Sequence, residues 1–301
     1  MTTAMFHVKH HASASKRGSS RGLDAARPAL ISAMAGLLGL ATAACSSPEE
    51  VAEKTGVAKA TATAGTATAA ASSAGGEGSN LEDNAEQDGG TREFQYSWPA
   101  AVSAIPALRD RFTQERDTAL AEQKAEWQSA LADMAGEDCT ACKSLSFQKS
   151  WAVVADLPRF LSLSADMYFY TGGAHGNSGF DALVWDREAE AALAPEALFR
   201  SEAALQETLG DAWCKALRAE KQQRMGEDFT DDGFFPCPPI ADLTVLLGSS
   251  NKQTFNRIGL IAAPYVAGSY AEGPYEVTLP ITPAVLAAVK PEYKAAFASP
   301  K

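Results

Sequence analysis

The sequence predicts an α+β domain in which a mostly antiparallel sheet packs against two longer helices. Apolar residues recur at helical spacing in two long segments, from Pro99 to about residue 135 and from Glu202 to about Met225. Short strand-like runs are grouped around these segments instead of alternating strictly with them. A glycine-rich turn joins two of the runs, as in a β-hairpin.

The first predicted elements are a strand and a long helix. Residues 94–98 alternate apolar and polar side chains, which indicates an edge or half-buried strand. Pro99 then opens the helix, because its missing N–H costs nothing in a first turn. The apolar stripe comprises Ile105, Leu108, Phe112, Leu120, Trp127, Leu131 and Met134. The charged middle of this helix, residues 113–126, is expected to face water.

The remaining elements follow in two groups. Strands are predicted over 150–155, 159–164, 166–170 and 180–186, then a short helix over 195–199. The second long helix buries Leu205, Leu209, Ala212, Trp213 and Leu217. Strands over 243–247, 255–261 and 275–279 precede a short terminal helix over 283–289. No long linker interrupts residues 93–301, which are predicted to form the folded part.

Residues 1–44 have the order of an export signal. Five basic residues precede an apolar run from Ala29 to Ala44, and small residues lead directly to Cys45. The segment resembles a bacterial lipoprotein signal with Cys45 as the lipidated residue. The alternative is an ordinary secretory signal with an incidental cysteine. The expected location is the cell envelope, lipid-anchored and facing the periplasm, and Ser46 after the cysteine is compatible with the outer membrane.

Composition after the signal separates a tether from the domain. Residues 45–92 are rich in Ala, Thr, Ser, Gly and Glu and are expected to form a disordered tether. Beyond residue 44 there are 21 Lys and Arg against 36 Asp and Glu. Such a chain repels nucleic acid and favours a cationic partner such as a basic protein, although exported proteins are often acidic for solubility alone.

Four cysteines remain in the predicted domain. An even count in an oxidising compartment predicts disulfides, and we pair Cys139 with Cys142 and Cys214 with Cys237 because each pair lies in one local segment. The Cys139–Cys142 motif could also be a redox pair or half a zinc site. A structural disulfide is preferred, because the motif follows what reads as a helix end and has no second such motif. No metal and no cofactor are expected.

The segment from Tyr168 to Asn177 contains His175, the only histidine outside the first 11 residues. Chemistry that needs two imidazoles is therefore excluded. Its glycines allow positive φ or close packing, and His175 and Asn177 are expected to project from the turn. A plain hairpin turn is the alternative. The motif has neither the ending of a phosphate-binding loop nor the spacing of a nucleophile elbow.

The segment from Tyr170 through Gly172, Gly173, His175 and Asn177, followed by Phe180-Asp181 and Leu198-Phe199, resembles the signature of the domain of unknown function 3298. The segment from Ala263 to Pro274, with the strand over 275–280, resembles the second landmark of that family. The region 93–165 is similar to the companion domain of unknown function 4163, and 166–301 to domain 3298.

The resemblance implies an envelope location and recognition rather than catalysis. One relative is the lysozyme-binding ectodomain of an anti-sigma factor, and another precedes a polysaccharide deacetylase domain. The implied partner is a basic, lysozyme-like envelope protein or a peptidoglycan fragment. The predicted ligand-binding residues lie on two loops that should meet: Tyr170, Gly172, Gly173, His175, Asn177, Tyr265, Tyr270 and Glu272.

A second hypothesis is an envelope hydrolase acting on peptidoglycan or another polysaccharide. Its acid and base would be chosen from Asp181, Asp186, Glu272 and Glu276. Glycoside cleavage needs two carboxyl groups about 5 to 9 Å apart. A pair of buried carboxylates in a cleft would support this hypothesis, whereas tyrosine and histidine side chains on a shallow, open surface would support binding.

Overall fold

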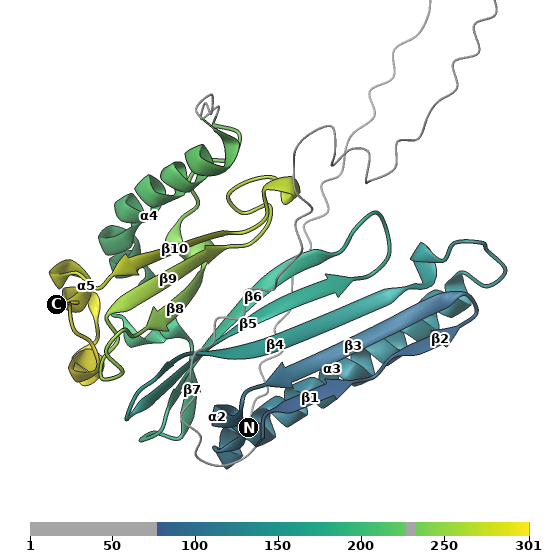
Figure 1. Ribbon diagram of the computed structural model, residues 1–301, viewed down its shortest axis with the longest axis horizontal. Coiled ribbons are helices and arrows are strands. Elements are labelled where there is room, and N and C mark those ends of the chain that lie inside the picture. The colour runs from purple at the N-terminus through teal and green to yellow at the C-terminus, as the bar shows by residue number, and fades with distance from the viewer. Residues whose placement is uncertain (1–76, 227–232, 301) are drawn as a thin grey trace, which may run out of the picture. The chain divides into compact units, whose positions relative to one another are not determined.

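The computed structural model describes residues 77–226 and 233–300, which form an α+β unit with two sheets and two long helices (Figure 1). The larger sheet has the order β1-β3-β4-β5-β6-β7, and β2 pairs with the same strand as β1. The smaller sheet has the order β10-β9-β8. The predicted fold class is confirmed, since every strand pair is antiparallel except β3 with β4.

The strands of the larger sheet are β1 (Ser79–Glu82), β2 (Ala85–Gln87), β3 (Gly90–Trp98), β4 (Leu145–Asp156), β5 (Phe160–Tyr170), β6 (Asn177–Asp186) and β7 (Ala191–Leu193). The smaller sheet contains β8 (Thr244–Gly248), β9 (Arg257–Ala262) and β10 (Tyr275–Pro280). The helices are α2 (Ala100–Ser103), α3 (Pro106–Asp133), α4 (Glu202–Met225) and α5 (Pro283–Ala288). Short 3₁₀ turns are η1 (Ala141–Lys143), η2 (Pro195–Leu198), η3 (Ile240–Asp242), η4 (Tyr270–Glu272) and η5 (Pro291–Ala296).

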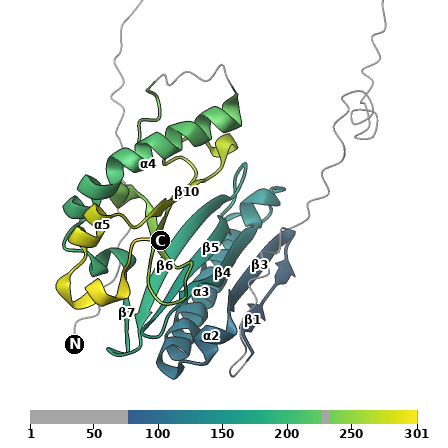
Figure 2. The ribbon, with the colours of Figure 1, turned by 60° about the vertical axis from the view of Figure 1, so that its left-hand side comes forward.

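Helix α3 covers one face of the larger sheet (Figure 2). Alternate residues of β3, namely Phe94, Tyr96 and Trp98, point to this face and are buried with Phe112 and Trp151. The phenol of Tyr96 accepts a hydrogen bond from the Trp151 indole at 3.0 Å. Helix α3 therefore has a buried apolar stripe while its opposite face stays in water.

A second core lies between α4, the smaller sheet and one end of the larger sheet. Ser201 caps α4 by accepting the N–H of Ala204, and Gly226 follows the last turn with positive φ. Trp213 is fully buried at the centre of the helix, and its indole donates to the Pro238 carbonyl at 3.1 Å. At the end of the larger sheet away from this core, Gln148, Ser150, Asp166 and Tyr168 are exposed, so one face of the sheet is open there.

Two predictions about the N-terminal part are wrong, and a third is confirmed in one of its two alternatives. The tether was predicted to extend to residue 92, but strands begin at Ser79 and pair through backbone hydrogen bonds that need few apolar side chains. The strand over 94–98 was predicted to be an edge or half-buried strand, and its alternating burial confirms the half-buried alternative. It is not an edge, because β1 and β2 form the outer edge and the strand pairs in parallel with β4. The first helix is interrupted before Pro106, which ends α2 and starts α3.

Two further differences concern the boundary at 165 and the water-facing middle of α3. Strand β5 runs without a break from Phe160 to Tyr170, so the 93–165 and 166–301 regions share one sheet. Gln123 is buried inside the segment expected to face water, where its amide donates to the Glu93 carbonyl at 2.8 Å and accepts from Arg92. A polar side chain with such partners can be buried at low cost.

Candidate ligand-binding site

The hairpin between β5 and β6 forms the first loop of the site. Gly172 and Gly173 have φ of +93° and +101°, a conformation that side-chain-bearing residues rarely adopt. Gly172 also packs against the turn at Ala141, where a Cβ would lie 3.3 Å from the carbonyl oxygen. Gly176 is buried beneath the ring of Tyr168, which leaves no room for a side chain. The glycines thus set the path that brings His175 to the surface.

The segment between β9 and β10 forms the second loop. Within it, Ser269 and Glu272 make a capping box around η4. Arg224, at the end of α4, donates to the carbonyls of Glu272 and Pro274 at 2.9 and 2.7 Å. Its guanidinium also lies 4.2 Å from the ring centre of Tyr275. Helix α4 therefore holds this loop from behind, which leaves the opposite side of the loop available for contact.

The two loops meet in a cluster of His175, Tyr265 and Tyr270, called the aromatic cluster below. The rings of His175 and Tyr270 stack with centroids 4.0 Å apart, and those of Tyr265 and Tyr270 lie 5.8 Å apart. His175 Nδ1 is 2.8 Å from the Gly176 carbonyl oxygen, which can only accept, so Nδ1 carries a proton. In the neutral ring Nε2 can then accept from the Tyr265 hydroxyl, 3.5 Å away.

Tyr265 has an unusual backbone conformation for its size. Its φ is +72°, although a bulky residue pays about 1–2 kcal/mol in the left-handed region. Its side chain is nevertheless 51% exposed, so packing in the core does not repay this cost. Because strained residues cluster at active sites and ligand clamps, this conformation supports Tyr265 as a candidate site residue.

A groove of about 320 Å³ lies on the open face of the larger sheet. Paired positions place Gln95, Gln148, Tyr168 and Ser178 in one row across β3 to β6. A second row contains Ser150, Asp166 and Phe180. Tyr168, which lines this groove, also covers Gly176, the neighbour of His175 in the aromatic cluster. Its amide, hydroxyl, carboxylate and aromatic groups can make polar and stacking contacts with a ligand.

Three predicted site residues, Tyr170, Asn177 and Glu272, make hydrogen bonds within the two loops. Glu272 accepts from the Ser269 N–H and the Tyr275 hydroxyl, both at 2.6 Å. Tyr170 donates to the Gly173 carbonyl at 2.8 Å, and Asn177 accepts the Ser178 N–H at 3.0 Å. Their polar groups are thus engaged within the loops, because short loops satisfy their own backbone first. Their part in ligand binding stays a prediction.

The environment of Glu272 keeps it ionised. Burial alone raises a carboxyl pKa, but the hydrogen bonds from the Tyr275 hydroxyl and from Ser269 outweigh it and lower the pKa of Glu272. Conversely, burial and the adjacent Glu272 carboxylate raise the pKa of Tyr275. Glu272 is thus a fixed anion inside the second loop.

The carboxylates of the hydrolase hypothesis are mostly engaged elsewhere. Asp186 is 1% exposed and accepts from both Nε and Nη2 of Arg159, which lowers its pKa. Asp181 pairs with the buried Lys149 at 2.9 Å, on the face covered by α3. Glu276 lies exposed on β10. These positions do not form a pair of buried carboxylates in the groove.

The disulfides join the predicted partners. Cys139 is bonded to Cys142, and Cys214 to Cys237. Within residues 77–226 and 233–300, no three His, Cys, Asp or Glu residues are placed to hold a metal ion. None of the helices in the same residues has the length and hydrophobicity of a membrane span. Cys45 and the signal lie outside the described residues.

Sequence reasoning missed Tyr168 and Asp166 on the groove and Arg224 behind the second loop. The first two could have been found from the period-2 alternation of β5, whose other face holds the buried Leu163 and Ala165. No local pattern marks Arg224, because its contacts are 48 and 50 residues away.

Comparisons with known proteins agree with the resemblance stated from the sequence. Residues 86–178 match the family model described as Deacetylase PdaC. A structure of a DUF3298 family member from Bacteroides fragilis is similar, with 18% identity over 68% of this chain and 90% of that chain and a TM-score of 0.48. The structure of a DUF3298 family protein from Pseudomonas aeruginosa PAO1 is also similar, with 18% identity over 74% of this chain and 97% of that chain and a TM-score of 0.45. No curated protein matches this chain.

Proposed function

We propose that this chain is a cell-envelope binding module that recognises a cationic protein through the aromatic cluster and the adjoining groove. The observation that carries the proposal is the meeting of His175 and Tyr265, 90 residues apart in sequence, at an exposed surface. Tyrosine and histidine rings on a shallow surface suit a protein contact, since tyrosine is enriched in interfaces. Lipidation at Cys45 would hold the module at a membrane.

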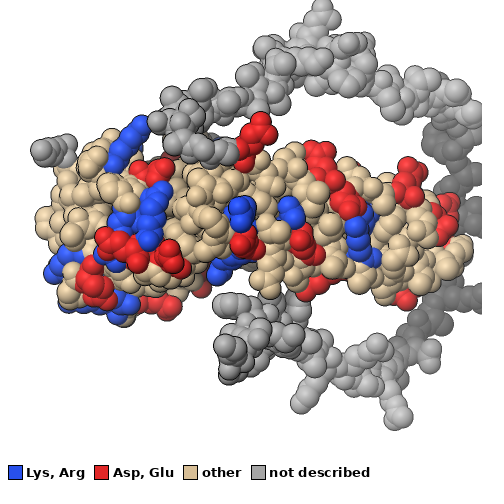
Figure 3. All heavy atoms as spheres, turned by 90° about the horizontal axis from the view of Figure 1, so that it is seen from below, with Lys and Arg blue, Asp and Glu red and all other residues tan. Residues whose placement is uncertain are grey.

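Charge supports a basic partner. The chain has an excess of 15 acidic residues beyond position 44, and Asp166 places a carboxylate in the groove. The exposed ring of Tyr265 can attract arginine or lysine side chains. On the face shown in Figure 3, however, acidic and basic side chains are interspersed. The net negative charge of the chain would speed its encounter with a basic protein, while the aromatic cluster would supply the specific contact.

The experiment is a calorimetric titration of the chain lacking residues 1–45 with lysozyme, the basic protein suggested by the resemblance, at low and moderate salt. Binding that weakens with salt and is lost in a His175→Ala, Tyr265→Ala double variant would support the proposal. Val153→Ala is the matched control, because Val153 is an exposed apolar residue of β4 outside the aromatic cluster. Soluble peptidoglycan fragments form the second arm.

The second arm separates the alternatives. Salt-insensitive binding of glycan fragments alone would contradict the protein partner and indicate a glycan ligand, which the amide and hydroxyl groups of the groove could also contact. Continuing heat with glycan and release of new reducing ends would instead indicate hydrolysis. Absence of heat with both lysozyme and peptidoglycan fragments would contradict the proposal that this surface binds either ligand.

A further inference from the structure

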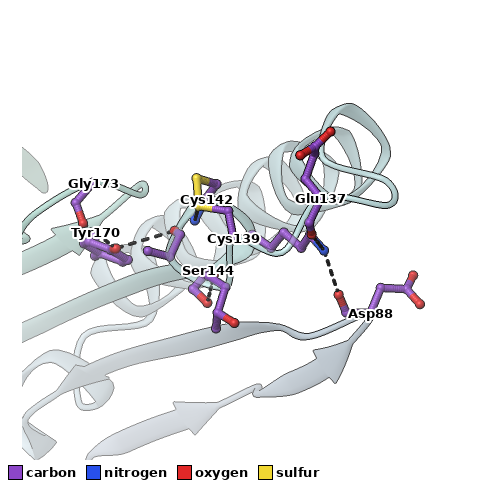
Figure 4. The surroundings of a disulfide bond; sticks show 10 residues. Asp88, Glu137, Cys139, Cys142, Ser144, Tyr170 and Gly173 are labelled. Carbon is purple, nitrogen blue, oxygen red and sulfur yellow. Dashed lines mark hydrogen bonds between the residues drawn. A yellow bond between two sulfur atoms is a disulfide. The ribbon is translucent and has the colours of Figure 1, made fainter.

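The Cys139–Cys142 disulfide lies in the turn between α3 and β4, beside the first loop (Figure 4). Cys142 is exposed and Cys139 is half-buried. The carbonyl oxygen of Ala141, between them, lies 3.5 Å from the Tyr170 hydroxyl of the first loop. A disulfide in such a position is accessible to a thiol in solution, which is the first requirement for exchange.

The turn is held in place without the sulfur–sulfur bond. Lys143 is 8% exposed, and its ammonium donates to the carbonyls of Glu137 and Asp88 at 2.6 and 3.3 Å. The Trp127 indole donates to the Lys143 carbonyl at 2.8 Å, and the Ser144 hydroxyl to the Thr140 carbonyl at 2.8 Å. These contacts come from α3, the turn and the loop before β3, and none of them needs an oxidised pair.

The bond also closes very little chain. Cys139 and Cys142 are three residues apart, whereas Cys214 and Cys237 are 23 apart. In the chain-entropy account, the shorter loop restricts the unfolded state less. The Cys139–Cys142 bond is therefore the one that the fold can lose more easily.

The two sulfurs are not equivalent. The backbone N–H of Cys142 donates to Cys139 Sγ, with a distance of 3.3 Å between nitrogen and sulfur. This hydrogen bond would stabilise a thiolate at Cys139, which makes Cys139 the better leaving group. Glu137 and Asp138 oppose a thiolate, but both are exposed to water, while the Lys143 ammonium lies on the buried side of the turn. Exposure of Cys142 and stabilisation of Cys139 thus point to one direction of attack.

We infer that Cys139–Cys142 is a redox-active disulfide that exchanges with a protein dithiol, a role that goes beyond the proposed binding function and does not depend on it. A partner thiolate attacks Cys142 Sγ, the Cys139–Cys142 bond breaks, and Cys139 leaves as a thiolate. The second partner thiol, as thiolate, then attacks the partner's sulfur in the mixed disulfide and releases Cys142. The partner is oxidised to a disulfide, and Cys139 and Cys142 are reduced to two thiols that take up two protons.

The test uses the full chain with Cys45→Ser, so that only the four cysteines of the domain remain, and dithiothreitol as the dithiol. The native chain is equilibrated over a range of reduced to oxidised dithiothreitol, quenched and alkylated, and each cysteine is quantified by mass spectrometry. At the dithiothreitol ratio that reduces half of the Cys139–Cys142 disulfide, less than a tenth of the Cys214–Cys237 disulfide is expected to be reduced. The circular dichroism spectrum of the chain should be unchanged at that ratio. Reduction of both pairs together, or reduction only after unfolding in urea, would overturn the inference.

A second measurement tests the direction of attack. Brief exposure to glutathione, followed by acid quenching, is expected to place the glutathione on Cys142 at least tenfold more often than on Cys139. Equal labelling of the two residues, or a preference for Cys139, would contradict the assignment of Cys139 as the leaving group. Because both measurements use the native cysteine pair, neither depends on whether a cysteine variant folds.

Discussion

Replacing Glu272 by alanine tests whether this residue serves the second loop or a ligand. The change removes the carboxylate that accepts from the Ser269 N–H and the Tyr275 hydroxyl at 2.6 Å each. A hydrogen bond to a charged group contributes about 1.5–3 kcal/mol, and the two are not independent because they share one side chain. Tyr275 is 1% exposed, so its hydroxyl would lose its partner inside the protein.

The free energy of unfolding of Glu272→Ala is therefore expected to fall by about 3 kcal/mol. Urea unfolding followed by tryptophan fluorescence measures this free energy, because Trp213 lies in the same buried core as Tyr275. Glu276→Ala is the control: Glu276 is adjacent on β10 but exposed, and its effect should stay within about 0.5 kcal/mol. A Glu272→Ala effect equally small would refute the reasoning and return Glu272 to the candidate ligand residues.

The pH dependence of the same contact has a definite sign. The pKa of Glu272 is lowered in the folded chain, so its contribution is present above the ordinary value of 4.5 and is lost as the pH falls through the folded-state pKa. The difference in free energy of unfolding between the native chain and Glu272→Gln should be largest at neutral pH and should become smaller as the pH falls below 4.5. A difference that grows on acidification would contradict this assignment.

Three further predictions concern the fold and its loops. Asp186→Asn should lower the free energy of unfolding by about 3 kcal/mol at neutral pH, because Arg159 loses a buried, charged partner. The difference in stability from the native chain should narrow in acid, where the native carboxylate is protonated, and equal stability at pH 7 would contradict this prediction. Gly173→Ala should lower the free energy of unfolding by about 1–2 kcal/mol, because a residue with a Cβ is strained at the positive φ of this position. No atom lies within 4 Å of the added Cβ, so a clash adds nothing, and unchanged thermal stability would contradict this prediction. Joint replacement of Cys214 and Cys237 by serine should cost about 3 kcal/mol in chemical unfolding, and joint replacement of Cys139 and Cys142 clearly less; the reverse order would contradict the account.

Elements with strong local signals were predictable. Helix α4 was expected from Glu202 to Met225 and has these bounds, because Ser201 starts it, Gly226 ends it and an apolar stripe fixes its buried side. The β5–β6 hairpin followed from the glycines of its turn, since Gly172 and Gly173 need positive φ. In both cases the decisive interactions lie within a few residues of one another.

Elements that depend on distant partners were not predictable. Strands β1 and β2 have polar sequences, SNLE and AEQ, and exist because β3 offers them an edge. The interior position of β3 and its parallel pairing with β4 depend on the return of the chain after α3. The meeting of the two loops was expected from the resemblance, but the inward turn of Glu272 was not, because it depends on the side chain of Tyr275.

Tyr265 offers the most direct test of the proposed binding surface. Tyr265→Gly removes the ring and also relieves the left-handed strain, so the free energy of unfolding should stay the same or rise by about 1 kcal/mol, whereas calorimetric binding of lysozyme should weaken at least tenfold. Lys252→Gly is the matched control, because Lys252 also has positive φ, 57°, on a distant exposed turn, and binding should be unchanged. A Tyr265→Gly chain that binds lysozyme as tightly as the native chain would contradict the account.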